Sequence, residues 1–325
     1  MLDTFYRVRK IYFMVIAVIG VPVNLVAMVI LSRGKCGLAT CTTRYLVAMA
    51  TADLLAIVFD VLLWRVSYYY FPGTFLDITP VCSVITVLRT AATDCSVWFT
   101  VTFTFDRFVA ICCQKPKTKY CTGKTAGAIL TTTVVLLCFK NVPNFFRYDP
   151  AKVIDNVPWD CIGKLSYYTD FAWKGYRMFS TVLTPLLPFV LILLFNGLTV
   201  RHILVTSRVR KGLRGQNKAE NRSDPEMESR RRSVILLLTI SGSFITLWSV
   251  NVTEFLYNTI AGLDQNNYSD SEYIFQHTGY MLMLLSCCTN TFIYGVTQSK
   301  FREQFIRAVK YPLTSIIQLI NKQNI

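Results

Sequence analysis

The sequence predicts an all-α fold in which seven helices cross a lipid bilayer as one bundle, followed by a short amphipathic interfacial helix. Hydrophobic residues make up 53% of the 325 residues, and the mean hydropathy is +0.40. Both values exceed those of ordinary soluble domains. A helix needs roughly 20 apolar residues to cross the hydrocarbon layer. Seven stretches reach that length, at 11–32, 45–70, 79–113, 125–146, 176–207, 231–260 and 273–297.

The loops between these spans predict the orientation of the chain. Its net charge of +15 suggests nucleic acid as a partner, but 22 of the 34 Lys and Arg residues fall in alternate loops and in the C-terminal tail. Such sorting marks the cytoplasmic side of a membrane protein. Arg7, Arg9 and Lys10, ahead of the first span, are a mild counter-signal. We therefore expect a multi-pass protein of the plasma membrane with an extracellular N-terminus, a cytoplasmic C-terminus and no nucleic-acid partner.

Three segments follow from this topology: an extracellular N-terminus at 1–10, a membrane domain at 11–297 and a cytoplasmic tail at 298–325. The first span is too long for the apolar region of a signal peptide and lacks a cleavage site, so we expect it to remain as an anchor. Apolar residues recur at helical spacing among charges after the seventh span, which predicts a helix in contact with membrane lipid. These are Phe301, Phe305, Ile306 and Val309.

Two segments between spans have informative compositions. Lys211 to Glu228 mixes Gly, Asn and Pro with charged residues, so we expect it to be mobile. Asn267 begins an Asn-Tyr-Ser acceptor sequence for glycosylation in the last outer loop. The sequence does not decide whether that asparagine is modified.

Enzymatic and metal-binding functions are disfavoured. The two histidines, His202 and His277, belong to opposite sides of the membrane, and no cysteine pair has the C-x-x-C spacing. Gly123-Lys124-Thr125 resembles the end of a phosphate-binding loop, but Thr118 replaces the glycine required five positions earlier. The seventh span also has no lysine that would form a retinal Schiff base. We therefore expect that the protein is not an enzyme and that it binds no cofactor, apart from a sodium ion.

Polar residues inside the spans are the informative ones, because an ionisable group in the bilayer is costly unless it is paired or faces a cavity. Asp94 and Lys140 lie at heights in the third and fourth spans that allow pairing. A second set lies at similar depth in the first, second, third and seventh spans. Either it forms one hydrogen-bonded cluster around a cation or waters, or each side chain is satisfied by backbone. Its members are Asn24, Asp53, Ser96, Ser286 and Asn290.

The chain resembles the rhodopsin-like, class A G-protein-coupled receptors over essentially its whole length. Each matching feature alone is weak evidence, but all of them in this order are highly specific for the class. Within the class, three stretches resemble a subgroup of orphan receptors of fishes. The resemblance implies an extracellular ligand, either a small molecule or a short peptide, and a heterotrimeric G protein as partners. The features are Gly20 to Asn24, Leu46 to Asp53, Cys82, Asp106-Arg107-Phe108, Pro188, Phe244 with Trp248, and Asn290 to Tyr294.

The resemblance also implies roles for individual residues. Cys82 and Cys161 should form a disulfide that ties the long outer loop over the bundle. Asp106, Arg107, Asn196 and Tyr294 occupy the positions of the switch that meets the G protein. The sequence departs from the family pattern at several positions. Arg230 stands where the sixth span usually carries an acid, so we hypothesise raised basal signalling. Asn196 replaces a tyrosine, and Val250 and Thr291 replace prolines, which predicts straighter helices.

The family's ligand site would lie between the outer halves of the helices. Arg89 is informative there, because amine-binding members carry an acid at its position and this chain carries the opposite charge. Arg89 either pairs with a carboxylate or phosphate of the ligand or is neutralised internally by Asp60. The residues at the depth of the site are Asp60, Arg89, Thr93, Trp248, Asn251, Phe255, His277 and Tyr280.

Two other functions are consistent with a seven-helix bundle. A transporter or channel would need a continuous polar path and often internal repeats, and the sequence has neither. A receptor that scavenges ligand without activating a G protein is compatible with the altered motifs.

Overall fold

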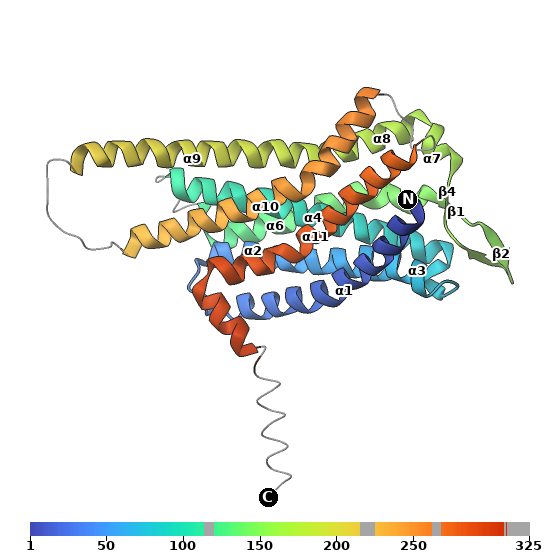
Figure 1. Cartoon of the computed structure of the whole chain (residues 1–325), viewed down its shortest axis with the longest axis horizontal. Helices are drawn as coiled ribbons and strands as arrows, with labels where there is room; N and C mark the ends of the chain where they lie inside the picture. The colour runs from blue at the N-terminus through green and yellow to red at the C-terminus, as the bar shows by residue number, and fades with distance from the viewer. Residues whose placement is uncertain (114–119, 215–224, 262–267, 309, 311–325) are drawn as a thin grey trace, which may run out of the picture.

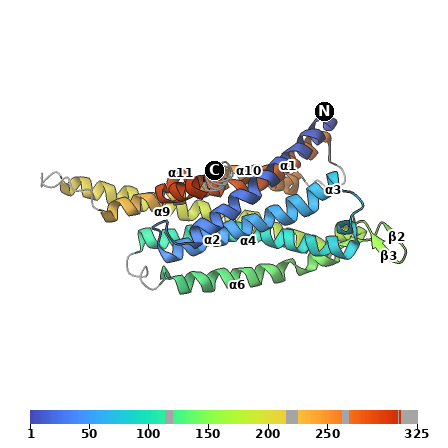
Figure 2. The same cartoon turned by 90° about the horizontal axis from the view of Figure 1, so that it is seen from below.

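The computed structural model describes residues 1–113, 120–214, 225–261, 268–308 and 310. It contains seven helical segments that are long and apolar enough to cross a membrane, packed side by side with their long axes roughly aligned (Figures 1 and 2). The predicted seven-helix bundle is therefore confirmed. The first three segments comprise α1 (Leu2–Ser32), α2 (Thr40–Ala56) with the π-helical η1 (Ile57–Val66) and α3 (Ser67–Tyr70), and α4 (Thr79–Cys112).

The remaining four segments complete the bundle. The fourth is α6 (Gly123–Asn141), which continues as the 3₁₀ turn η3 (Val142–Arg147). The fifth consists of α8 (Phe171–Thr181), the π-helical η4 (Val182–Leu186) and α9 (Leu187–Arg214). The sixth is α10 (Pro225–Ala261) and the seventh is α11 (Asp270–Thr297).

Helix α4 is the centre of the bundle. It packs against α2, η1, α6, α9 and α10, and it is the most buried of the seven spans. Helix α6 lies at an edge of the bundle beside α4 (Figure 2). The apolar core follows α4 on the α2 side, with Tyr45, Leu46 and Phe103 fully buried.

Three helices are longer than the sequence predicted. Helix α1 begins at Leu2, so the predicted extracellular segment 1–10 is mostly helical. Helix α9 continues to Arg214 and α10 starts at Pro225, so the ends of the segment predicted to be mobile are helical, while 215–224 lies outside the described residues. Lysine and arginine favour helices, and proline is well placed in a first turn. Asn267 also lies outside the described residues.

The fifth span breaks before α9. Thr184 has φ −150° and ψ 110°, outside the helical region, and Pro185 follows it inside η4. Proline removes a backbone donor and restricts the residue before it to extended conformations. The predicted marker Pro188 instead lies in the first turn of α9, where proline is tolerated. Helices α10 and α11, which lack interior prolines, run without such a break.

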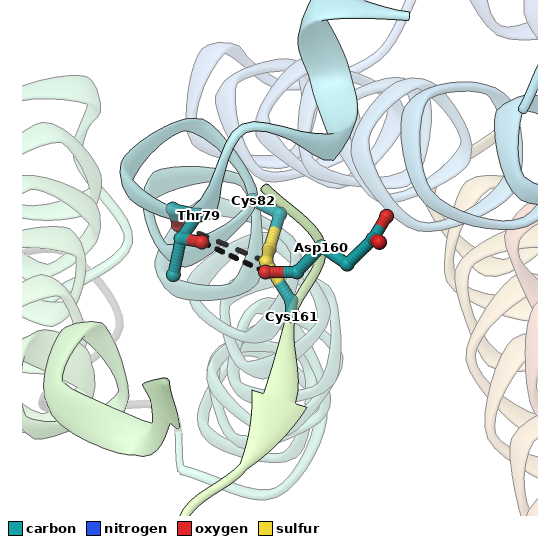
Figure 3. The surroundings of a disulfide bond; sticks show 4 residues. All are labelled: Thr79, Cys82, Asp160 and Cys161. Carbon is teal, nitrogen blue, oxygen red and sulfur yellow. Dashed lines mark hydrogen bonds between the residues drawn. A yellow bond between two sulfur atoms is a disulfide. The ribbon is translucent and has the colours of Figure 1, made fainter. Parts of the chain in front are cut away.

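A long loop between η3 and α8 is attached at the N-terminal end of α4. Its strands pair as two antiparallel ladders, β1 (Tyr148–Asp149) with β4 (Ile162–Gly163) and β2 (Lys152–Ile154) with β3 (Val157–Trp159). The short helix α7 (Leu165–Thr169) then leads to α8. The loop is attached by the Cys82–Cys161 disulfide and by a hydrogen bond of 2.7 Å from Thr79 Oγ1 to the Asp160 carbonyl (Figure 3). The predicted disulfide is therefore confirmed.

A short helix follows α11, as the amphipathic pattern predicted. Residues 299–308 are helical and turn away from the axis of α11 (Figure 1). Phe301 is fully buried, with its ring centroid 5.7 Å from that of Tyr294. Ile306 is 45% exposed. Val309, the last residue of the predicted apolar set, lies outside the described residues.

Candidate functional site

The outer half of the bundle contains a carboxylate between two arginines. Asp60 is buried, and its Oδ1 accepts from Arg65 Nε at 3.2 Å and from Arg89 Nη1 at 3.0 Å. The guanidinium of Arg89 also lies 4.5 Å from the ring centroid of Trp64. Of the two alternatives for Arg89, the structure therefore contains the internal pair with Asp60.

Arg65 was not among the predicted site residues, and the local backbone explains why. Asp60 and Arg65 are five residues apart, which in an α-helix separates side chains by about 140° around the axis. The segment Ile57–Val66 is instead a π-helix, in which residues five apart are stacked. Arg65 therefore reaches Asp60, and its guanidinium lies 4.7 Å from the ring centroid of Phe13 and 5.8 Å from that of Tyr280. Apolar periodicity does not reveal a π-helix in advance.

The remaining predicted ligand-site residues differ in how far they are buried. Thr93, Phe255, His277 and Tyr280 are half-buried. His277 packs 4.1 Å from Tyr273 by ring centroids, and its Nδ1 is buried without a hydrogen bond.

Asn251 and Trp248 belong to the contacts between α10 and α11. A Cβ on Gly279 would lie 3.3 Å from the Asn251 Cα, so the two helices approach closely there. Trp248 is 3% exposed, stacks on Phe244 at 5.2 Å and donates from Nε1 to Ser286 Oγ at 3.1 Å. It therefore links α10 directly to α11.

The predicted polar cluster forms in part. Asp53 is completely buried and accepts from Ser96 Oγ and, at 2.8 Å, from Asn290 Nδ2. Ser286 bonds to Trp248 instead, and Asn24 donates to the carbonyls of Gly20 and Cys287 at 2.9 Å. Among the residues that the structure describes, Asp53 has no Lys or Arg partner. A small cavity beside it is lined by polar and apolar side chains: Ser96, Thr100, Ile240, Ser243, Phe244, Ser286, Thr289 and Asn290.

At the inner end of α4, Arg107 is buried and held by its neighbours. Its Nε and Nη2 donate to Asp106 Oδ2, the former at 3.0 Å. Its Nη1 and Nη2 reach Ser233 Oγ and Cys41 Sγ at 3.4 Å. Cys121 Sγ approaches the Asp106 carbonyl at 3.9 Å, and burial with the nearby Asp106 raises the pKa of this thiol to about 11. The Arg230 side chain, where the family lock would form, lies outside the described set.

The other two predicted switch residues are not bonded to Arg107. Asn196 Oδ1 and the Tyr294 hydroxyl are buried, and neither has a hydrogen-bond partner among the residues that the structure describes. Tyr294 packs on Phe301 instead.

A cavity opens below Arg107 on the side of the basic loops. It has a volume of about 300 Å³ and lies between the α1–α2 loop, α2, the inner ends of α4 and α10, and the start of the helix at 299–308. Three of its lining side chains are cationic, namely Arg107, Arg232 and Lys300. These side chains give the cavity a positively charged lining.

The predicted contact between Asp94 and Lys140 is present within a larger network. Lys140 Nζ and Asn141 Nδ2 each donate to Asp94 Oδ2 at 2.7 Å. Asn144 Nδ2 donates to Asn141 Oδ1 at 3.1 Å and to the Tyr176 hydroxyl at 2.8 Å. This network joins the third, fourth and fifth spans inside the bundle.

Comparisons with known proteins identify the fold family. The family model described as 7 transmembrane receptor (rhodopsin family) matches residues 23–294. The FMRFamide receptor of Drosophila melanogaster is 22% identical over 312 residues, 90% of this chain and 52% of that receptor. Compound eye opsin BCRH2 of Hemigrapsus sanguineus is 23% identical over 282 residues, 85% of this chain and 71% of the opsin. The chain thus spans about half the length of the first of these relatives and about seven tenths of the second.

Proposed function

Because the chain belongs to the rhodopsin family of seven-transmembrane receptors, we propose that it binds an extracellular ligand between the outer halves of its helices and activates a heterotrimeric G protein at its inner cavity. The observation that carries this proposal is the position of Arg107, which lines the inner cavity while its neighbour Asp106 restrains it. A charged side chain held at the edge of a cavity can exchange one partner for another. The ligand is a small molecule or a short peptide.

The two ends communicate through a change in population between two arrangements of the bundle. Contacts around Asp60 and Arg89 distinguish the arrangements at the outer end. Trp248, which stacks on Phe244 and bonds to Ser286 on the seventh helix, transmits this difference between α10 and α11. At the inner end, α10 carries Ser233, so a displacement of α10 breaks its contact with Arg107 and widens the cavity.

Asp53 supports a bound sodium ion as part of this proposal. Its carboxylate lies beside the hydroxyl of Ser96, the amide of Asn290 and a small cavity that Ser286 also lines. Carboxylate, hydroxyl and amide oxygens are suitable ligands for a hard cation. A sodium ion there would neutralise a carboxylate that lacks a basic partner in the described part of the bundle.

The proposed location is the plasma membrane, with the N-terminus outside and the tail at 298–325 inside. The excess of Lys and Arg in the inner loops and the amphipathic helix at 299–308 support this orientation. The helix would lie in the lipid interface with Arg302 and Arg307 toward water.

A G-protein dissociation assay in cells tests the proposal. Wild-type receptor and an Arg107→Ala variant are each co-expressed with sensors for the main G-protein classes, with mock-transfected cells as baseline and surface expression matched. We expect wild-type dissociation above mock for at least one class, with the variant at the mock level. If wild type and variant both equal mock for every class, the proposal is contradicted.

That negative outcome would favour the second candidate, a ligand-scavenging receptor without G-protein output. Asn196 is the observation that favours it, because its Oδ1 is buried without a partner at the position where the family resemblance implies a switch tyrosine.

A further inference from the structure

The outer site carries more positive than negative charge. Two arginines share one oxygen of Asp60, whereas the other two buried ion pairs in the described spans, Asp94 with Lys140 and Asp106 with Arg107, are one to one. Glu254, the other buried acid near the outer end, is held by neutral donors, the amides of Asn258 and Gln276 and the hydroxyl of Tyr268. The Asp60 cluster therefore retains one uncompensated positive charge.

Other outer-end cations add to this excess. Arg9 is buried among tyrosines, donates to the Tyr273 hydroxyl at 2.9 Å and has an Nε without a hydrogen bond. Arg147 lies 4.4 Å from the ring centroid of Tyr167 and is likewise unpaired at Nε. Aromatic rings offset part of the cost of a buried cation, but they supply no net negative charge.

The two guanidiniums also have unused donors. A guanidinium has five N–H groups, and within the described residues Arg65 and Arg89 each donate one hydrogen bond, to Asp60 Oδ1. The Arg89 Nε is buried without a partner. Their side chains remain 14% and 16% exposed, so neither guanidinium is fully enclosed by the protein. Beside them lie the rings of Trp64 and Tyr280.

We propose that Arg65 and Arg89 together bind a carboxylate of the ligand, with the adjoining aromatic rings contacting an apolar or aromatic body. The assignment rests on the proposed function and names the chemical class of its ligand. A carboxylate accepts two parallel hydrogen bonds from a guanidinium. Its single negative charge balances the one positive charge that Asp60 leaves uncompensated in this cluster.

The π-helical turn is what creates this site. It brings Arg65 onto the face of Asp60, and Asp60 then holds both guanidiniums in place before a ligand arrives. Preorganised donors reduce the entropy lost on binding. Asp60 is therefore a positioning residue, because it accepts one hydrogen bond from each guanidinium and leaves the other donors for the ligand.

The Tm of the purified receptor, measured with added benzoate or with its uncharged equivalent benzamide, tests this assignment. We expect benzoate at millimolar concentrations to raise the Tm of wild type in a dose-dependent manner, and benzamide to leave it unchanged. Arg65→Gln and Arg89→Gln should each need at least about tenfold more benzoate for the same shift, because each removes one of two charged hydrogen-bond partners. Lys152→Gln, which removes an exposed outer-loop cation, should respond as wild type.

Several results would overturn the assignment. They are equal shifts with benzoate and benzamide, no shift with benzoate, or an undiminished benzoate response in both arginine variants. A larger Tm shift with phenyl phosphate than with benzoate would contradict the proposal that the site binds a singly charged anion. The readout needs no G protein, so a benzoate response without signalling would refute the proposed function and leave the carboxylate site intact.

Discussion

Two acids on the second span show how environment assigns different tasks to the same side chain. Asp53 and Asp60 are both buried. Asp53 accepts from the neutral donors Ser96 and Asn290, whereas Asp60 accepts from two guanidiniums. A buried carboxylate with only neutral donors is costly unless a cation joins it or it takes up a proton. Asp53 is therefore suited to an ion, and Asp60 to holding arginines.

This difference predicts a sodium effect at Asp53. Wild-type receptor should have a higher Tm in sodium chloride than in equimolar choline chloride. When sodium is at ten times its Kd, its binding should raise the free energy of unfolding by about 1.4 kcal/mol. Asp53→Asn should abolish the difference. Asp94→Asn, which alters another buried acid, should retain it. An equal sodium response in wild type and Asp53→Asn would refute the ion site.

The paired charges Asp94 and Lys140 predict a non-additive pair of mutations. Lys140→Met leaves Asp94 buried with only the Asn141 amide, which should cost about 3–5 kcal/mol, as does removing one partner of a buried ion pair. The double variant Asp94→Leu with Lys140→Met should recover most of that loss. Unfolding of the purified receptor measures both. Losses that simply add would show that the two side chains are not coupled.

The contacts of Arg9 and Lys10 explain why positive charges precede the first span, on the side where the topology predicts few of them. Arg9 and Lys10 were predicted to weigh against an extracellular N-terminus. In the structure the Arg9 guanidinium lies 5.4 Å from the ring of Tyr6 and 5.6 Å from that of Tyr69, and Lys10 lies 5.2 Å from the ring of Tyr70. Cation–π contacts within the fold satisfy these charges. They have structural roles in the packing of α1 against its neighbours.

At the scale of elements, the sequence predicted the helices from their long apolar stretches. It did not predict the places where the backbone departs from the α-helix. The seven apolar stretches predicted the spans because roughly 20 residues contribute to each. The π-helical Ile57–Val66 was not predicted, because its residues fit an α-helix equally well. The break at Thr184 was also missed, since Pro188 rather than Pro185 was read as the marker of the fifth span.

The helix at 299–308 was predicted by its amphipathic pattern, and its attachment yields a test. Phe301→Ala removes a fully buried ring from the contact with Tyr294, which should cost about 3–5 kcal/mol locally. We expect faster amide hydrogen exchange across 299–308 with little change in α4. Ile306→Ala, at an exposed position of the same helix, serves as the control. Unchanged exchange in Phe301→Ala would show that this ring does not anchor the helix.

At the scale of the whole molecule, the fold and the family followed from sequence, whereas the site followed only in part. The predicted Cys82–Cys161 disulfide is present, and Asp60 pairs with Arg89, which is one of the two alternatives that the sequence left open. Ser286 and Asn24 were expected around Asp53 but bond elsewhere, because similar depth does not fix the direction of a side chain. Depth along a helix is readable from sequence, and rotation about its axis much less so.

The central claim is that the restrained Arg107 is the switch by which this receptor activates a G protein. Asp106→Asn weakens the contacts that hold Arg107, so it should favour the active arrangement without any ligand. The decisive measurement is the rate of nucleotide exchange on purified G proteins of each class with receptor in lipid nanodiscs. We expect Asp106→Asn to accelerate exchange on at least one class several-fold over empty nanodiscs, and the double variant Asp106→Asn with Arg107→Ala to return it to that baseline. Exchange at the baseline rate with Asp106→Asn on every class would contradict the claim.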